Sequence, residues 1–466
     1  IEAIELRGSP ELKDRYLAKM VAGTWAGTMN LTEPQAGSDL AAVRTRAVPQ
    51  GDGTYKLFGQ KIFITYGEHD YTENIIHMVL ARTPDAPEGV KGISLFLVPK
   101  FLVNADGSLG ARNDVQCVSL EHKLGIHASP TAVMAYGDHG GAIGYVVGEE
   151  NRGLEYMFIM MNLARFSVGM EGVGISERAY QRAAAYAKER VQGKPVGADK
   201  GAAGARIIEH PDIRRMLMTM RAHTEAMRAV AYVTAAAMDN AHRHPDARAK
   251  ERHQAFVDFL IPVVKGCSTE TAQEIASLGI QVHGGMGFIE ETGAAQHYRD
   301  ARIMTIYEGT TGIQANDFIG RKTARDGGAV AQGIAKEMES IAQELAGHAD
   351  GNLKVIGARL AEGVAAARAA AEWMVSAYGP NPRAAHAVAV PYLKLWGLVL
   401  GGWQLGRGAL AAARRLAGGA GDVRFLTAKI VTARFYADAL LPQAAGVAQT
   451  VTSGGEAALA LPAEQL

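Results

Sequence analysis

Apolar and polar positions follow different patterns along the chain, and each pattern predicts a different kind of element. Residues 9–23 place apolar side chains at helical spacing behind Ser9, a favourable N-cap, and Pro10, a favourable first helical residue. The apolar positions of this stripe are Leu12, Tyr16, Leu17 and Met20. The pattern predicts a short helix over 9–23.

Between residues 29 and 147 the apolar positions form short continuous or alternating runs instead. Three of these runs are YKLFGQKIFIT (55–65), NIIHMVLAR (74–82) and GISLFLVP (92–99), with glycine and proline between them. Alternation bounded by such residues is typical of strands and hairpins. This segment is predicted to be a β domain, either a small barrel or a sandwich.

From about residue 153 onward, helical spacing dominates. Long amphipathic patterns cover 155–191, 211–240 and 250–283, and a fourth helix is expected after Glu308. This fourth helix should bury Ile313, Phe318 and Ile319. Four such helices predict an antiparallel bundle, with Met157, Met160 and Met161 in its core rather than in a pocket for an apolar ligand chain. The last part of the chain is alanine-rich and also helical, and predicts an added domain.

The expected organisation is therefore α+β, in four parts. These parts are an N-terminal helical segment (1–28), a middle β-barrel or sandwich domain (29–147), a four-helix bundle (148–328) and a helical extension domain (329–466). The chain begins with Ile1 rather than methionine, and we expect further residues upstream of it in a longer protein.

Composition narrows the functional classes. The 466 residues are 48% apolar, and 48 basic residues balance 48 acidic ones, which gives no net field for nucleic acid or anionic lipid. Cys117 and Cys267 cannot form a disulfide framework and favour a reducing, cytoplasmic compartment, and neither lies at a metal-ligand spacing. The run 393–406 comes nearest to a membrane span, but it contains Lys394 and several glycines. No membrane span and no metal site are expected.

Common nucleotide and hydrolase motifs do not explain the chain. The sequence contains no G-x-x-x-x-G-K-[ST], no H-E-x-x-H and no G-x-S-x-G. The segment GGMGFIEETG (284–293) lacks the third glycine of a dinucleotide fingerprint and follows a helical pattern rather than a strand.

Eight unusual strings occur instead, in a fixed order. They are MNLTEPQAGSDL (29–40), GQKIFITYG (59–67), KLGIHASPT (123–131), LARFSVGMEGVG (163–174), KERVQG (188–193), QVHGGMGFIEE (281–291), HYRDAR (297–302) and YEGTTGIQ (307–314). Together they strongly resemble the acyl-CoA dehydrogenase family of flavoenzymes, over roughly residues 9–322. The string GFIEETGAAQHYRDAR is similar to a bacterial branch that has an added C-terminal helical domain and includes 3-(methylthio)propionyl-CoA dehydrogenases and long-chain relatives.

The resemblance implies a fold, a cofactor and a reaction. The fold is a helical N-terminal domain, a middle β domain and a C-terminal four-helix bundle, with FAD between the last two. On this alignment most of the N-terminal domain is missing, and 9–23 is its last helix. The reaction is α,β-dehydrogenation of an acyl-CoA thioester to the 2-enoyl-CoA, in which a base removes an α-proton and hydride passes to flavin N5.

Glu308 matches the catalytic base of this family. The α-C–H of a thioester is weakly acidic in water, so its removal needs a positioned carboxylate and stabilisation of the thioester oxygen. The resemblance implies that the Glu308 backbone N–H and a ribityl hydroxyl of FAD bind this oxygen. Gly309 leaves room for the thioester, and burial is expected to raise the pKa of Glu308. The alternative is a glutamate that only favours a helix N-terminus.

The resemblance also implies which residues bind the cofactor. Phe63 stands where many members have tryptophan, Gly312 replaces a common glutamine, and the loop after Arg190 is one residue shorter than the common pattern. Gly37 and Gly284 belong to turns whose backbone can approach a ligand closely. The expected FAD contacts are Leu31, Thr32, Gly37, Ser38, Phe63, Ile64, Thr65, Arg190, Gln192, Gln281, Gly284, Gly285, Thr310 and Gly312, of which Arg190, Gln192, Gln281, Gly284 and Gly285 match contacts across a subunit interface.

Substrate contacts follow from the same alignment, and several have an ordinary alternative. The expected contacts are Ser38, Ser129, Asn162, Arg165 and Gly309. Ser129 is equally typical of a capping serine, and Arg165 of a structural ion pair. Asn162 stands where the family commonly has an acid. His283, Glu33 and Asp39 are all expected to have structural roles.

The expected partners are an acyl-CoA substrate, an electron-transfer flavoprotein as acceptor and a second copy of the chain, as dimer or tetramer. An acyl-CoA oxidase would share the same first half-reaction. A DNA-associated alkylation-response flavoprotein would need a basic C-terminal region, but acids and bases are interspersed over 330–466. A short thioether-bearing or straight acyl chain is the preferred substrate.

Overall fold

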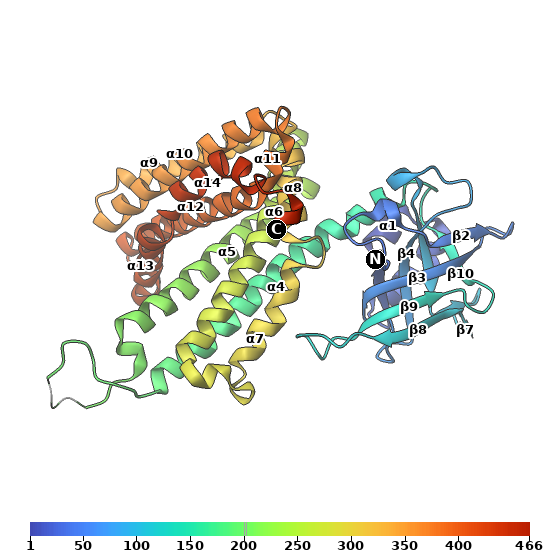
Figure 1. Cartoon of the computed structure of the whole chain (residues 1–466), viewed down its shortest axis with the longest axis horizontal. Helices are drawn as coiled ribbons and strands as arrows, with labels where there is room; N and C mark the ends of the chain where they lie inside the picture. The colour runs from blue at the N-terminus through green and yellow to red at the C-terminus, as the bar shows by residue number, and fades with distance from the viewer. Residues whose placement is uncertain (200, 202) are drawn as a thin grey trace. The chain divides into compact units, whose positions relative to one another are not determined.

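The computed structural model describes residues 1–199, 201 and 203–466, and it divides into two compact units, Ile1–Ala164 and Arg165–Leu466 (Figure 1). Strands lie only in the first unit among the described residues, and the second unit is helical. This α+β organisation agrees with the predicted fold class. The finer division into four domains stays a prediction.

A helical segment opens the first unit. After α1 (Glu2–Arg7), the chain forms one helical run made of α2 (Pro10–Leu12), η1 (Lys13–Leu17) and α3 (Ala18–Val21). The Leu12 backbone N–H donates to Ser9 Oγ at 3.3 Å, so Ser9 is the N-cap. The predicted helix over 9–23 is confirmed.

Strands follow over residues 25–146. They are β1 (Trp25–Asn30), β2 (Arg46–Pro49), β3 (Tyr55–Thr65), β4 (Asn74–Ala81), β5 (Ser94–Pro99), β6 (Phe101–Val103), β7 (Leu109–Arg112), β8 (Val115–Leu120), β9 (Thr131–Tyr136) and β10 (Ala142–Val146), with short turns η2 (Leu40–Ala42) and η3 (Gly89–Gly92). Their order is β1-β4-β5-β10-β3-β9-β8, with β2 also on β3 and with β6 paired to β7. The β1–β4 pair is parallel, and the other pairs are antiparallel.

The main sheet curls around its own core. Buried residues of β4, β5, β3, β9 and β8 share one cluster, which includes Leu57, Val79, Phe96, Val115 and Met134. A shared apolar interior of this kind agrees with the barrel-or-sandwich prediction.

A second cluster joins the sheet to helices. Tyr16 and Trp25 pack here with Met157 and Met161 from the start of α4 (Gly153–Glu189). Met160 packs against the same cluster. The prediction that these methionines lie in the bundle core was therefore wrong. The 3.6-residue repeat gives the buried face of a helix but not the element that covers it.

The second unit continues α4 and adds further helices. They are α5 (Pro211–Arg243), α6 (Ala247–His283), α7 (Ala294–Ala301), α8 (Thr311–Ile319), α9 (Ala329–Ala346), α10 (Gly351–Tyr378), α11 (Pro382–Ala387), α12 (Ala389–Ala417), α13 (Val423–Ala439) and α14 (Gln443–Ala458). Short turns are η4 (Ile207–Glu209), η5 (Gly284–Phe288), η6 (Glu290–Thr292), η7 (Arg302–Thr305), η8 (Gly320–Ala324) and η9 (Ala463–Gln465). The predicted fourth helix is α8, which buries Phe318 and Ile319 but leaves Ile313 half-exposed.

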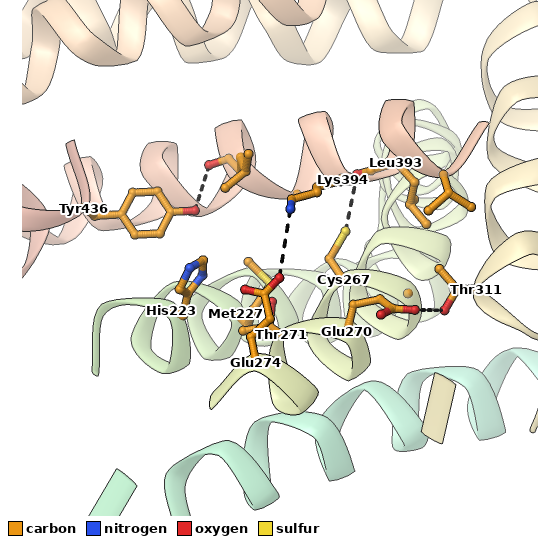
Figure 2. Close-up of a pocket in the computed structure, with 14 residues that line it drawn as sticks. His223, Met227, Cys267, Glu270, Thr271, Glu274, Thr311, Leu393, Lys394 and Tyr436 are labelled. Carbon is orange, nitrogen blue, oxygen red and sulfur yellow. Dashed lines mark hydrogen bonds and ion pairs between the residues drawn. The ribbon is translucent and has the colours of Figure 1, made fainter. Parts of the chain in front are cut away.

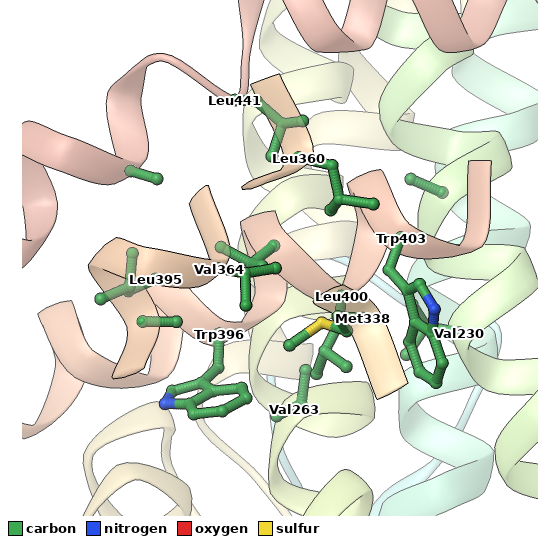
Figure 3. Packing of buried hydrophobic residues seen from close by; sticks show 14 of the residues in the cluster. Val230, Val263, Met338, Leu360, Val364, Leu395, Trp396, Leu400, Trp403 and Leu441 are labelled. Carbon is green, nitrogen blue, oxygen red and sulfur yellow. The ribbon is translucent and has the colours of Figure 1, made fainter. Parts of the chain in front are cut away.

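Helices α9 to α14 pack on the bundle through one shared core (Figure 3). Trp396 and Leu400 of α12 and Met338 of α9 lie in the same cluster as Val230 of α5 and Val263 of α6. Bundle and extension therefore bury each other's apolar faces. No described helix is both long and apolar enough to cross a membrane.

Candidate active site

Glu308 lies in a short loop between η7 and α8, in a backbone conformation that non-glycine residues rarely adopt. Its φ is +56°, and Gly309 follows with a φ of +88°. Thr310 then caps α8, because its side chain accepts the Ile313 backbone N–H at 3.1 Å. A left-handed non-glycine residue costs of order 1–3 kcal/mol and persists only where its surroundings hold it, which is common at functional sites.

Two side chains hold this loop, and neither was among the predicted site residues. Lys265 Nζ, on α6, donates to the Gly309 carbonyl at 2.6 Å. Gln314 Nε2, on α8, donates to the carbonyls of Glu308 and Gly309 at 3.3 and 3.5 Å. The positive φ favours glycine at 309, and a Cβ there would lie 2.7 Å from Gln314 Nε2 and displace that amide.

The Glu308 carboxylate forms no hydrogen bond with the described part of the chain. Among the described residues, none donates to this carboxylate, and none accepts the backbone N–H of Glu308. Burial raises the pKa of Glu308, while the charges of Arg165 and Lys265 act in the opposite direction and Glu171 adds to the rise. A carboxylate with a raised pKa and an unused N–H beside it is suited to proton abstraction from a neighbouring carbon.

Arg165 is buried on α4, close to this loop. Its Nη1 lies 3.9 Å from Asp317 Oδ2, and its Nε has no hydrogen-bond partner in the described part of the chain. The ion pair agrees with the structural alternative, and the unpaired Nε leaves one buried donor free for a ligand. Tyr307, next to the base, donates its hydroxyl to Glu171 on the same helix as Arg165.

A cavity of about 150 Å³ lies where α8 begins, between the bundle and the extension (Figure 2). Thr311 Oγ1 donates to Glu270 Oε1 at 2.5 Å at one end. Cys267 Sγ donates to the Leu393 carbonyl at 3.3 Å, and burial raises the pKa of Cys267 to about 12, so this thiol is inert. The cavity reaches from Thr311, the first residue of α8, to α12.

The predicted flavin-facing residues of the first unit lie around one irregularity in β3. A register shift between Lys61 and Ile64 leaves Phe63 at φ +60° with its ring 59% exposed. The Ile62 backbone N–H donates to the Thr32 carbonyl at 2.9 Å, which ties the segment after β1 to this position. Half-buried Leu31 and exposed Thr65 lie in the same two segments, whereas the Ile64 side chain is buried in the sheet core, which leaves only its backbone for a ligand.

Glu33 anchors this segment. Its Oε1 accepts from Lys61 Nζ at 2.8 Å and from Thr45 Oγ1 at 2.6 Å, and its Oε2 accepts from the Arg44 backbone N–H at 2.8 Å. Burial alone would raise the pKa of Glu33, but Lys61 and these hydrogen bonds lower it to about 2. Glu33 is structural, as predicted, because its carboxylate is fully occupied.

Most of the predicted phosphate and CoA contacts of the first unit are exposed to solvent. Gly37 and Ser38 lie exposed in a turn, and a Cβ on Gly37 would meet nothing within 4 Å. Ser129 is half-buried, and its backbone N–H donates to the carbonyl of Ile126. Ile126, like Phe63, has a positive φ although it is not glycine. Asn162 is exposed on α4.

The residues predicted to contact FAD across a subunit interface are also exposed. Arg190 follows α4, and its Nη2 lies 3.5 Å from Gln192 Oε1. Gln281 lies in the last turn of α6, and exposed Gly284 and Gly285 follow the helix, with a φ of +60° at Gly284. A Cβ on either glycine would meet nothing within 4 Å, so the backbone is open to a ligand.

The structure brings Arg165, Glu308, Gly309, Thr310 and Gly312 together in the second unit. Sequence reasoning missed Lys265 and Gln314. The signal for Lys265 was available: it interrupts the apolar face of FLIPVVKGC (259–267), where a lysine needs a buried partner.

His283 is buried, bonds the Gly279 carbonyl through Nδ1 at 2.6 Å and stacks on Tyr186. These contacts support its structural assignment.

Comparison with known proteins gives the family. Residues 28–138 match the description "Acyl-CoA dehydrogenase, middle domain", residues 151–322 match "Acyl-CoA dehydrogenase, C-terminal domain", and residues 334–462 match "Acetyl-CoA dehydrogenase C-terminal like". The 3-methylmercaptopropionyl-CoA dehydrogenase of Ruegeria pomeroyi is 54% identical over 460 residues, which are 98% of this chain and 77% of that protein. The chain belongs to the acyl-CoA dehydrogenase family.

More distant members agree. The caffeyl-CoA reductase-Etf complex subunit CarC of Acetobacterium woodii is 31% identical over 309 residues, 66% of this chain and 71% of that protein. A solved acyl-CoA dehydrogenase of Bacillus anthracis complexed with FAD has the same fold, with a TM-score of 0.76 and 22% identity over 99% of this chain and 74% of that one. The predicted recognition is confirmed, and it includes the extension.

Proposed function

We propose that this chain catalyses FAD-dependent α,β-dehydrogenation of an acyl-CoA thioester, with Glu308 as the base. Family membership supports the reaction class. The observation that carries the residue assignment is the Glu308 loop: the backbone is left-handed, the carboxylate is partly buried without a hydrogen bond from any described group, and the adjacent N–H is unused. A structural glutamate in this chain, Glu33, has the opposite properties.

The residues present are compatible with FAD. In the first unit, the exposed Phe63 ring offers an apolar face for a flat heteroaromatic ring, and the open Gly37–Ser38 backbone suits a phosphate. In the second unit, Thr310 and the open turn at Gly284 provide hydroxyl and backbone groups. We propose these as FAD contacts, together with the other cofactor residues named above.

The proposed mechanism assigns each protein group one task. A Glu308 carboxylate oxygen takes the α-proton, and the electron pair of that Cα–H bond forms the Cα=Cβ double bond as hydride leaves the β-carbon, while the thioester oxygen carries the negative charge that develops. Bound FAD supplies the acceptor for this hydride. The free backbone N–H of Glu308 donates to the thioester oxygen, where negative charge develops. Gly309 keeps space beside the thioester, and Lys265 and Gln314 hold the loop.

Acyl specificity is proposed from the 54% identical relative, whose name specifies 3-methylmercaptopropionyl-CoA. The sequence predicted a short thioether-bearing or straight acyl chain, and the name of this relative favours the first of these. The test is kcat/KM on a series of 3-(methylthio)propionyl-, butyryl-, octanoyl- and palmitoyl-CoA. The thioether substrate should rank first, and a higher value for palmitoyl-CoA would overturn this part of the proposal.

We further propose an electron-transfer flavoprotein as electron acceptor, a homo-oligomer and a cytoplasmic location. The oligomer is supported by large exposed apolar side chains beside the Gln281–Gly285 turn, including Phe288 at 82% exposure with Met286 and Ile289. Nucleic-acid binding is disfavoured because several exposed arginines of the extension are paired with carboxylates, as in Arg368–Glu339 at 2.6 Å. Peroxide formation without an added acceptor would instead indicate an oxidase.

The deciding experiment is Glu308→Gln in the full chain, mixed anaerobically with acyl-CoA while flavin absorbance is followed. Loss of the base should slow flavin reduction by about 10²–10⁴-fold. Glu274→Gln is the matched control, because Glu274 lies on α6, is largely exposed and pairs with Lys394 at 4.0 Å. Undiminished bleaching in the Glu308→Gln protein would show that the base is elsewhere.

A further inference from the structure

Lys265 is a fully buried lysine whose charge has no direct partner of opposite sign. Its side chain is 0% exposed, and no carboxylate of the described residues lies within 4.0 Å of Nζ. Nζ donates a hydrogen bond to the Gly309 carbonyl at 2.6 Å. Burying an unpaired ammonium is costly, so a chain that retains one has a use for the charge.

The hydrogen-bond partner of Lys265 is next to the proposed base. Glu308 and Gly309 are consecutive residues with positive φ, and their carbonyls also accept from Gln314 Nε2. Lys265 therefore holds the Gly309 end of this turn through a hydrogen bond, and Gln314 donates to the carbonyls of both residues. A neutral amide side chain at position 265 could also donate to the Gly309 carbonyl. The hydrogen bond therefore accounts for a donor at this position, but not for the positive charge of Lys265.

The charged groups around the turn give a reason for the positive charge of Lys265. Arg165 and Glu171 face Glu308 from α4, Lys265 and Glu270 lie on α6, and Tyr307 is bonded to Glu171. Burial lowers the pKa of Lys265 to about 8, although the charge of Glu308 opposes this shift. At neutral pH the ammonium is still charged, and it is one of two cations that offset the burial of Glu308.

We propose that Lys265 is a positioning residue for the reaction: its hydrogen bond holds the left-handed turn that presents Glu308, and its positive charge keeps the Glu308 carboxylate ionised at neutral pH. This inference rests on the proposed function of Glu308. It also gives a reason for the presence of Lys265 in the apolar run FLIPVVKGC, because no step of the reaction itself requires this lysine.

Two substitutions separate the two tasks. Lys265→Met removes both the donor and the charge, whereas Lys265→Gln keeps an N–H donor and removes only the charge. Gln314→Leu removes a donor from the same turn without changing any charge. Lys394→Met is the control for net charge, because Lys394 lies on α12 with a largely exposed side chain.

The first measurement does not depend on turnover. In substrate-free holoenzyme, the infrared C=O band of the protonated Glu308 carboxyl is titrated with pH and is assigned by its absence in Glu308→Gln. Removing a nearby cation should move the midpoint upward by about one unit or more in both Lys265 variants. Gln314→Leu and Lys394→Met should leave it within a few tenths of a unit.

The second measurement is the rate of flavin reduction at saturating acyl-CoA as a function of pH. At pH 7 the Lys265→Gln protein should be slowed about tenfold and should recover most of its rate at higher pH, because only ionisation is lost. Lys265→Met should recover less, since the turn is also loosened. Gln314→Leu should be slower at every pH, with an unchanged midpoint.

Failure of this inference is distinguishable from failure of the proposed function. If Glu308→Gln abolishes reduction but the Lys265 variants keep the wild-type midpoint with FAD bound, Lys265 is only structural. An equal midpoint shift in Lys394→Met or Gln314→Leu would also overturn the inference. The Gln314→Leu protein keeps the test open if the Lys265 variants do not fold. An upward shift of its Glu308 midpoint would show that loss of a turn hydrogen bond alone, with Lys265 still present, changes the ionisation of Glu308, which contradicts the inference.

Discussion

The chain buries a lysine near a glutamate in each of its two units: Lys61 near Glu33 in the β-rich unit, and Lys265 near Glu308 in the helical unit. In the first pair, Nζ lies 2.8 Å from the carboxylate. In the second, Nζ bonds the neighbouring carbonyl instead, and the carboxylate receives no hydrogen bond from the described residues.

The difference shows how the same two residue types can be structural or reactive. Direct contact and hydrogen bonds lower the pKa of Glu33 to about 2, so this carboxylate stays ionised and cannot take up a proton near neutral pH. Burial raises the pKa of Glu308, and the cations that face it offset only part of the rise. A base needs a site on its carboxylate that the protein has left vacant, and only the second arrangement provides one.

The largest expected effect is on stability, from Lys61→Met. This variant leaves the Glu33 carboxylate buried without its cation and should destabilise the β-rich unit by about 3–5 kcal/mol. The measurement is the thermal and denaturant midpoint at pH 7, with the exposed Lys91→Met as control. Lys61→Met combined with Glu33→Leu should recover part of the loss, since no charge is then left unpaired. A midpoint equal to that of Lys91→Met would mean that the pair contributes nothing.

Acid should reveal the same interaction in the wild type. The folded pKa of Glu33 lies below its ordinary value of 4.5, so its stabilisation is present above about pH 4.5 and is lost as the pH falls toward about 2. In Lys61→Met this part of the acid dependence should be weaker.

An intermediate effect is expected where the extension packs against α6. A Cβ on Gly397 of α12 would lie 2.4 Å from Cys267 Sγ, two residues after Lys265. Gly397→Ala should therefore destabilise the helical unit by about 1–3 kcal/mol. It should also slow flavin reduction by about twofold to tenfold, because the α6 turn that carries Lys265 must shift.

The matched control is Gly408→Ala in the same helix, where a Cβ would meet nothing within 4 Å. This variant should keep wild-type activity and lose no stability. If Gly397→Ala lowers the midpoint of unfolding but leaves the reduction rate unchanged, the extension supports the fold without affecting the base.

The smallest effect concerns Glu308 itself. Its folded pKa is raised, so the folded protein holds a proton that the unfolded chain has already released, and stability falls as the pH rises above about 4.5. Glu308→Gln should therefore give a slightly higher Tm than wild type at pH 7, with the difference vanishing below about pH 4. Glu33→Gln should lower the Tm. A lower Tm for Glu308→Gln would remove the contrast between the two glutamates.

Much of the fold was readable from local patterns. Strands β3, β4 and β5 coincide closely with the runs 55–65, 74–82 and 92–99, and α6 ends at His283 as its pattern predicted. The assignment of Met157 and Met161 failed, because burial of a helix face is a local signal while the identity of its neighbour is not. The expected site residues depended on the resemblance, and their contacts with FAD and CoA stay predictions.

The residue order by itself determined the kinds of element, the family and the position of Glu308, because periodicity, turn residues and motif spacing are properties of neighbouring positions. Only the tertiary structure decided that Lys265 bonds a carbonyl 44 residues further along the chain, and that Glu33 accepts several hydrogen bonds while no described group donates to the Glu308 carboxylate. The physical reason is that a pKa depends on burial and on nearby charges, which come together only when distant segments pack.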